Sequence, residues 1–240
     1  MKKNIFKNSN IQGLYDKKNE HDACGLGFIA HIKGIKSHKI VSDGIKILEN
    51  LEHRGATGAD PLVGDGAGML VQIPHEFFIK ECKTINIDLP EEGNYSVGYY
   101  FLPKKNIFKE KIKKIITNTF NSYKHEFICW RNVPTDNSKL TKDSEILAAE
   151  PFHLQGFFHK PKNLKSDEFE RELFVIRKII SNRVLQEFGE LEHFYPVSLS
   201  SRTIVYKGMF LADQLGPYFS DLRDKNFTSA LSLVHQRFST

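Results

Sequence analysis

Residues 20–32 read EHDACGLGFIAHI, and the character of the sequence changes within them at Cys24. Residues 1–23 are polar, with Lys, Asn and Asp prominent and little periodicity, which is typical of a leader or an irregular segment. From Cys24 onward the residues are small and apolar, which predicts a buried strand. The boundary therefore predicts a leader over residues 1–23 and a folded unit that starts at Cys24.

Cys24 has two interpretations. Most free cysteines are buried structural residues, and composition alone favours that role. The small neighbours Ala23, Gly25 and Gly27 favour a reactive role, because they leave the backbone open to a ligand and do not shield the thiol. If the Ala23–Cys24 bond were cleaved, the new α-amino group would have a pKa of about 7.7–8.0 and could act as general base for its own thiol. One residue would then supply both nucleophile and base.

The bulk composition indicates a globular protein. Of the 240 residues, 40% are hydrophobic and 26% are charged, and a chain of this length can bury a substantial core. The 34 Lys and Arg exceed the 29 Asp and Glu by only five, so the charge does not indicate nucleic-acid binding. The densest basic stretch, residues 104–114, has apolar residues at helical spacing, which predicts a solvated helix face.

The three cysteines, Cys24, Cys82 and Cys129, lie far apart in the sequence and show no CxxC spacing. This pattern argues against a disulfide scaffold and a cysteine zinc site, and it suits a reducing compartment. The histidines show neither HxxxH nor HxH spacing, so we expect no metal. No stretch approaches the roughly 20 apolar residues of a membrane span, and we therefore expect a cytoplasmic protein without a membrane partner.

Strand and helix patterns mix along the chain without strict alternation, which indicates the α+β class, with sheet layers covered by helices. Ser37 is a candidate N-cap of the first helix, which Gly55 would end, and Gly189 would end the longest helix. Helical spacing is found between residues 37 and 55 and over 74–83, 104–116 and 167–188. Strand patterns cover 24–32, 69–73, 95–102 and 126–133 and recur three times in the last fifty residues.

His53, Arg54 and Gly55 follow the first predicted helix. They can form a C-terminal cap, with basic residues at the negative end of the helix dipole and glycine in a left-handed conformation. An arginine at a helix end is also well placed to bind a carboxylate or an oxyanion, so both roles stay open. Residues 64–68, GDGAG, match no phosphate-binding spacing and precede a strand pattern, which favours a structural turn.

The chain ends with HQRFST at residues 235–240. Along a strand, Arg237 and Ser239 would face one side, and Phe238 and Thr240 would face the other. An edge strand with ordinary polar residues accounts for this pattern. Because termini rarely fall inside a strand, we expect either an exposed edge or a longer protein of which this is the first part.

Four segments together resemble the class II glutamine amidotransferase domain at the N-terminus of the glutamate synthase large subunit. The HRG motif is shared with other class II amidotransferases such as amidophosphoribosyltransferase, whereas EHDACG and GADPLVGDGAG resemble glutamate synthase in particular. The match is collinear, with a weaker middle between residues 83 and 191. The four segments are residues 13–34, 51–78, 198–210 and 229–240.

The resemblance implies an N-terminal nucleophile hydrolase fold, a four-layer α/β/β/α sandwich that is incomplete at the C-terminus here. Residues 1–23 would be a propeptide, and residues 24–240 the N-terminal part of the amidotransferase domain. The fold would place the nucleophile at the first residue of the mature chain.

Four positions match motifs of the family. Cys24 would be the catalytic nucleophile, and Arg54 of the HRG motif would belong to the catalytic site. Arg237 and Thr240 of the HxRxxT motif would recognise glutamine, Arg237 through the α-carboxylate. In the family, an Asn-Gly oxyanion hole and an acidic residue for the ammonium group lie further downstream, so we expect this chain alone to be inactive, because one oxyanion donor is typically worth about 10²–10³ in kcat.

The resemblance also implies the wider reaction. Ammonia would be transferred to 2-oxoglutarate in a downstream synthase domain that uses FMN and an iron–sulfur cluster, and this part of the chain would hold no cofactor. A small NADPH-oxidising subunit or ferredoxin would be the partner. Two alternatives stay open: an inactive truncated remnant or interaction module, and the glutaminase domain of another class II enzyme such as amidophosphoribosyltransferase.

Overall fold

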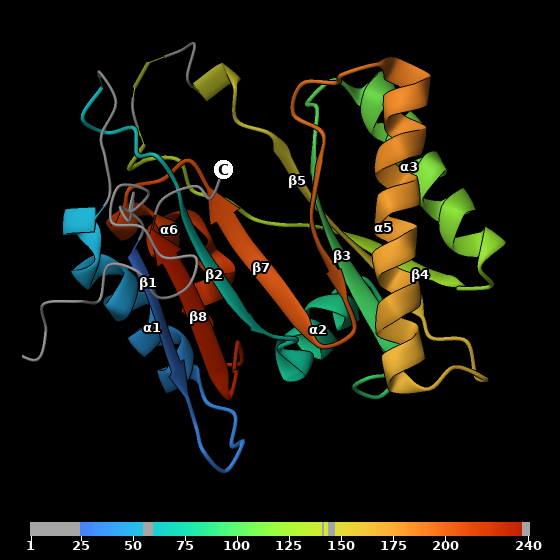
Figure 1. Cartoon of the computed structure of the whole chain (residues 1–240), viewed down its shortest axis with the longest axis horizontal. Coiled ribbons are helices and arrows are strands. Elements are labelled where there is room, and N and C mark those ends of the chain that lie inside the picture. Colours follow the sequence, from blue (N-terminus) through green and yellow to red (C-terminus); the bar gives the residue numbers. More distant parts are fainter. Residues whose placement is uncertain (1–24, 55–59, 141, 144–146, 237–240) are drawn as a thin grey trace, which may run out of the picture.

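The computed structural model describes residues 25–54, 60–140, 142–143 and 147–236. Within them, the strands form two antiparallel four-stranded sheets (Figure 1). The first sheet has the order β1-β8-β2-β7, and the second has the order β4-β5-β3-β6. The strands are β1 Gly25–Ala30, β2 Ala67–Gln72, β3 Tyr95–Leu102, β4 Phe127–Asn132, β5 Phe152–His159, β6 Tyr195–Ser200, β7 Thr203–Gly208 and β8 Leu231–Gln236.

The helices lie on the sheets through faces whose buried residues recur at helical spacing. In α1, for example, Ile40, Val41, Gly44 and Leu48 are buried. The described α-helices are α1 His38–Asn50, α2 His75–Lys83, α3 Asn106–Ser122, α5 Ser166–Phe188 and the short α6 Leu215–Tyr218; the 3-10 turns are η3 Glu52–Arg54, η4 Ala212–Gln214 and η5 Ser220–Arg223.

One face of each sheet shares the larger apolar cluster. Met69 of β2 lies opposite Tyr206 of β7, and the Tyr206 ring lies 5.3 Å from the Tyr99 ring of the second sheet. Helix α1 packs on the same face of the first sheet, because a Cβ added at Gly44 would lie 2.2 Å from Ser232 Oγ and 3.1 Å from Met69 Cε. The first sheet therefore carries α1 and the second sheet on one face.

The smaller apolar cluster joins the other face of the second sheet to α3 and α5, which run beside each other along it (Figure 1). Phe120 of α3 stacks on Phe158 of β5 with ring centroids 3.5 Å apart. The opposite face of the first sheet is open among the described residues: Leu26 is 60% exposed, Phe28 is 71% exposed and Leu233 is 37% exposed. The structure is thus a mixed α/β arrangement of antiparallel sheets, with helices on one outer face of the second sheet.

Most predicted elements are confirmed, one prediction needs correction, and one strand was missed. Ser37 precedes α1 in an extended conformation, but its side chain makes no capping hydrogen bond. Strand β5 was not predicted: the sequence FHLQGFFH alternates only over its first four residues, and nearly all of the strand is buried on both faces. Gly189 does end α5, with a φ of 71° that favours glycine. Gly55 lies outside the described residues.

His153 of β5 is buried with both ring nitrogens satisfied. Its Nδ1 lies 2.7 Å from the Tyr99 hydroxyl, and its Nε2 lies 3.0 Å from the Tyr218 hydroxyl. Tyr218 donates its one hydroxyl hydrogen to Glu150 Oε1 at 2.7 Å. The Tyr218 oxygen therefore accepts from Nε2–H, and Tyr99 donates to Nδ1, so the neutral imidazole is the form that this environment fits.

This environment predicts a loss of stability in acid. Burial lowers the pKa of His153 to about 4; Glu150 opposes the shift and Lys104 adds to it. The unfolded chain takes up this proton at about pH 6.5 and the folded chain only near pH 4, so the free energy of unfolding falls across that window, by up to about 3 kcal/mol. Urea unfolding followed through Trp130, the single tryptophan, measures this. His153→Gln should show a shallower pH dependence, and an equal dependence in both proteins would contradict the assignment.

Candidate active site

The candidate site lies at the end of the first sheet where β1 begins and β8 ends. In the antiparallel register, Gly25 lies opposite Gln236, and Gln236 also lies opposite Ala67 of β2. Cys24 and Arg237 directly precede and follow these paired residues in the sequence, and both lie outside the described residues, as does Thr240. The described strands therefore bring together the sequence neighbours of two predicted site residues that are more than two hundred positions apart.

Helix α1 approaches the same end of the sheet from one side. A Cβ added at Gly27 would lie 2.4 Å from Ile47 Cγ2 and 3.7 Å from Leu51 Cδ1, so the last turn of α1 sits directly on β1. The chain continues from Leu51 into η3, which ends at Arg54. Arg54 therefore follows by three residues Leu51, which lies against β1. The side chain of Arg54 lies outside the described part of the structure. A side chain at position 27 would displace this turn.

Gln236 contributes a buried polar group that sequence reasoning missed. Its side chain is 1% exposed, and Oε1 accepts no hydrogen bond among the described residues. A buried amide oxygen without a partner costs stability, and such groups often reflect a functional requirement. The sequence signal was the polar residue directly before Arg237 in an apolar strand, but its burial depends on the pairing with β1 and β2.

Residues 64–66 form a tight bend that leads into β2, which begins at Ala67. A Cβ added at Gly64 would lie 2.2 Å from the carbonyl oxygen of Phe210, and Gly66 has a φ of 126°. Both positions require glycine for these reasons. The close approach to the backbone after β7 fits the tight turn that the sequence favoured over a phosphate-binding loop.

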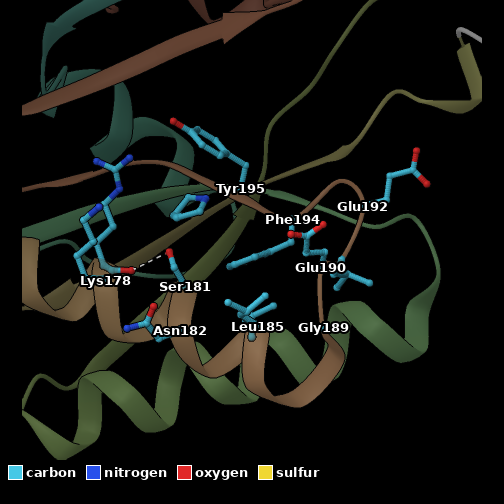
Figure 2. A pocket seen from close by; sticks show the side chains of 13 residues that line it. Lys178, Ser181, Asn182, Leu185, Gly189, Glu190, Glu192, Phe194 and Tyr195 are labelled. Carbon is cyan, nitrogen blue, oxygen red and sulfur yellow. Dashed lines mark hydrogen bonds between the residues drawn. The ribbon is translucent and has the colours of Figure 1, made fainter. Parts of the chain in front are cut away.

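A cavity of about 700 Å³ lies elsewhere, between α5 and the segment that enters β6. Figure 2 shows Ser181, Asn182 and Leu185 of α5 on one side and Phe194 and Tyr195 on the other. Figure 1 places α5 at the opposite side of the molecule from β1 and β8. This cavity is therefore separate from the candidate site.

Across residues 25–54, 60–140, 142–143 and 147–236, no three His, Cys, Asp or Glu side chains gather closely enough to hold a metal ion. Over the same ranges, no helix combines the length and apolarity needed to cross a membrane.

The family model described as glutamine amidotransferases class-II matches residues 24–240. The chain belongs to this family. The match begins at Cys24, where the sequence changes character, and extends through β8. The amidotransferase assignment made from the sequence is confirmed.

Several proteins similar to this chain are glutamate synthases. This chain is 46% identical over 230 residues to the glutamate synthase [NADPH] large chain of Bacillus subtilis, over 95% of this chain and 15% of that protein. It is 41% identical to the glutamate synthase [NADH] of Saccharomyces cerevisiae, over 95% of this chain and 11% of that protein. It is 38% identical to the ferredoxin-dependent glutamate synthase of Pyropia yezoensis, over 97% of this chain and 15% of that protein. The chain thus spans less than a sixth of the length of these relatives.

Proposed function

We propose that this domain hydrolyses glutamine to glutamate and ammonia, with Cys24 as an N-terminal nucleophile. The observation that carries the proposal is the β1–β8 register, in which Gly25 lies opposite Gln236. Cys24 is bonded to Gly25 and Arg237 to Gln236, and consecutive Cα atoms are about 3.8 Å apart. A nucleophile and a substrate-binding arginine at these positions would therefore belong to the same end of the first sheet.

The reaction would need no separate basic side chain. After residues 1–23 are removed, the α-amino group of Cys24 would accept the thiol proton. The thiolate attacks the side-chain amide carbon of glutamine, and the tetrahedral oxyanion collapses with release of ammonia, which takes up the proton from the amine. Water then hydrolyses the thioester, yielding glutamate and restoring the thiol.

The other predicted residues would position the substrate. Arg237 would bind the α-carboxylate of glutamine through its two-pronged guanidinium, with Thr240 beside it. Arg54 would lie in the active site at the end of η3. Gln236 Oε1 is an acceptor suited to an N–H group of the ligand or of the free amine. We assign no residue of this chain to the oxyanion hole or to the substrate ammonium group.

We further propose that residues 1–23 are a propeptide and that residues 24–240 are the N-terminal part of an N-terminal nucleophile hydrolase domain, a four-layer α/β/β/α sandwich. The two antiparallel sheets and the outer helices α3 and α5 support this fold. The exposed apolar side chains on the open face of the first sheet support it too, because they leave a surface on which another layer could pack.

In a protein of the relatives' length, ammonia would pass to 2-oxoglutarate in a synthase domain that carries FMN and an iron–sulfur cluster. The electron donor would be ferredoxin or a small NADPH-oxidising subunit. The printed names of the relatives, which include NADPH, NADH and ferredoxin, support a glutamate synthase and leave the donor open. The same names also favour a glutamate synthase over an amidophosphoribosyltransferase. We propose the cytoplasm as the compartment.

The test is the start of the mature chain. Intact mass and N-terminal sequencing of the full-length protein should find a chain that begins CGLGF, because the proposed base is the free amine of Cys24. The Cys24→Ala variant, measured in parallel, shows whether removal of residues 1–23 requires the thiol. A mature protein that retains Met1 would contradict the proposal, since Cys24 would then have no free amine.

A further inference from the structure

Two buried cysteines that the glutaminase reaction does not use lie in contact between α2 and β4. Cys82 is in the last turn of α2, and Cys129 is in β4. Their sulfur atoms are 3.8 Å apart, and the residues are 1% and 6% exposed. The two thiols are thus neighbours in the larger apolar cluster although 47 positions separate them in the chain.

A charged contact lies beside the thiols. Arg131 is two residues after Cys129 on β4, so the two side chains share a face of the second sheet. The Arg131 guanidinium donates to Glu81 Oε2 at 2.7 and 3.1 Å, and Glu81 directly precedes Cys82. The same pair of elements is therefore joined by an ion pair and by two adjacent thiols.

The two sulfurs share one electrostatic environment. The positive charge of Arg131 favours the thiolate of either sulfur, and burial opposes it. Either sulfur can donate the hydrogen bond to the other. The thiolate is the reactive form of cysteine.

We propose that Cys82 and Cys129 are an oxidisable pair that closes to an intramolecular disulfide with a hydroperoxide as oxidant. The thiolate of one cysteine attacks one oxygen of hydrogen peroxide, which breaks the O–O bond, gives a sulfenic acid on that sulfur and releases hydroxide. The thiol of the other cysteine then displaces the hydroxyl group and forms the S–S bond. In sum, two thiols lose two electrons and two protons, and one peroxide becomes two waters.

The contact distance makes the pair suited to this step. A disulfide bond is about 2.05 Å long, so the sulfurs at 3.8 Å must approach by about 1.8 Å, shared between two side chains and their backbones. Helix α2 ends one residue after Cys82, at Lys83, where the chain leaves the helix. Because the second thiol is already in contact, disulfide formation should precede further oxidation of the sulfenic acid.

The experiment uses the full-length protein with Cys24→Ser, which removes the thiol at the glutaminase site. After hydrogen peroxide treatment, peptide mapping should find Cys82 joined to Cys129, and the two should no longer react with iodoacetamide in denaturant. Dithiothreitol should restore both. The matched control Cys82→Ser should form no such linked peptide and should keep Cys129 reducible or alkylatable, with circular dichroism reporting that it folds.

Three results would overturn the proposal. Both thiols could stay alkylatable after peroxide treatment, either cysteine could gain two or three oxygens instead of a bond, or the linked peptides could join two chains. Mapping on the otherwise unchanged Cys24→Ser protein decides between these outcomes even if Cys82→Ser does not fold. Peptide mapping does not depend on glutaminase activity. A failure of the disulfide proposal can therefore be distinguished from a failure of the proposed function.

Discussion

Replacing Cys24 with alanine is expected to abolish glutamine hydrolysis in a protein of the relatives' length while leaving synthesis from free ammonia largely intact. The substitution removes the sulfur that would form the thioester, and no other group at this position could replace it. In a serine protease, loss of the nucleophile alone lowers kcat by about 10⁶-fold. Glutamate formation from glutamine, and from ammonia with 2-oxoglutarate, measures the two activities separately.

The same substitution at a buried thiol is the matched control. Cys82→Ala removes a sulfur from the core next to Cys129, away from the end of the first sheet, and it should retain glutamine hydrolysis. Equal glutaminase rates in Cys24→Ala and the unchanged protein would remove Cys24 from the reaction. Loss of both activities in Cys24→Ala would point to a structural role for this residue instead.

The largest expected loss of stability follows from Arg131→Ala. Arg131 is 8% exposed, and its guanidinium donates to both carboxylate oxygens of Asp221 at 2.8 Å. It also donates to Gln155 Oε1 at 2.9 Å, and the Tyr206 hydroxyl donates to Asp221 at 2.7 Å. Alanine leaves the Asp221 charge buried without its cation. Breaking a buried pair in this way costs about 3–5 kcal/mol, measurable by urea unfolding through the fluorescence of the adjacent Trp130.

Arg202→Ala provides the comparison. Arg202 also pairs with a carboxylate, that of Asp167, but their side chains are 50% and 80% exposed. Water solvates both charges after the substitution, so the urea midpoint should change little. Equal destabilisation by the two substitutions would show that burial does not determine the contribution of these arginines.

Some features of the candidate site are predictable from local sequence patterns, and others are not. The change of character at Cys24 and the helix that leads to Arg54 are local patterns, and the structure places the β1 start and the α1 end against each other. The burial of Gln236 was not predictable, because it arises from pairing with strands that lie elsewhere in the chain. The side-chain positions and roles of the predicted catalytic and substrate-binding residues stay predictions.

Most helices and strands follow from local sequence patterns, since hydrophobic periodicity and glycine positions act over a few residues, and the family follows from motifs that are continuous in the chain. Three features become apparent only when the chain is folded: β5 lies inside the second sheet, Arg131 bridges Glu81 and Asp221, and Cys82 touches Cys129. These contacts join residues remote in sequence, and a single sequence carries no periodic signal for them. Their partners are selected by packing and by the cost of burying a charge or polar group alone.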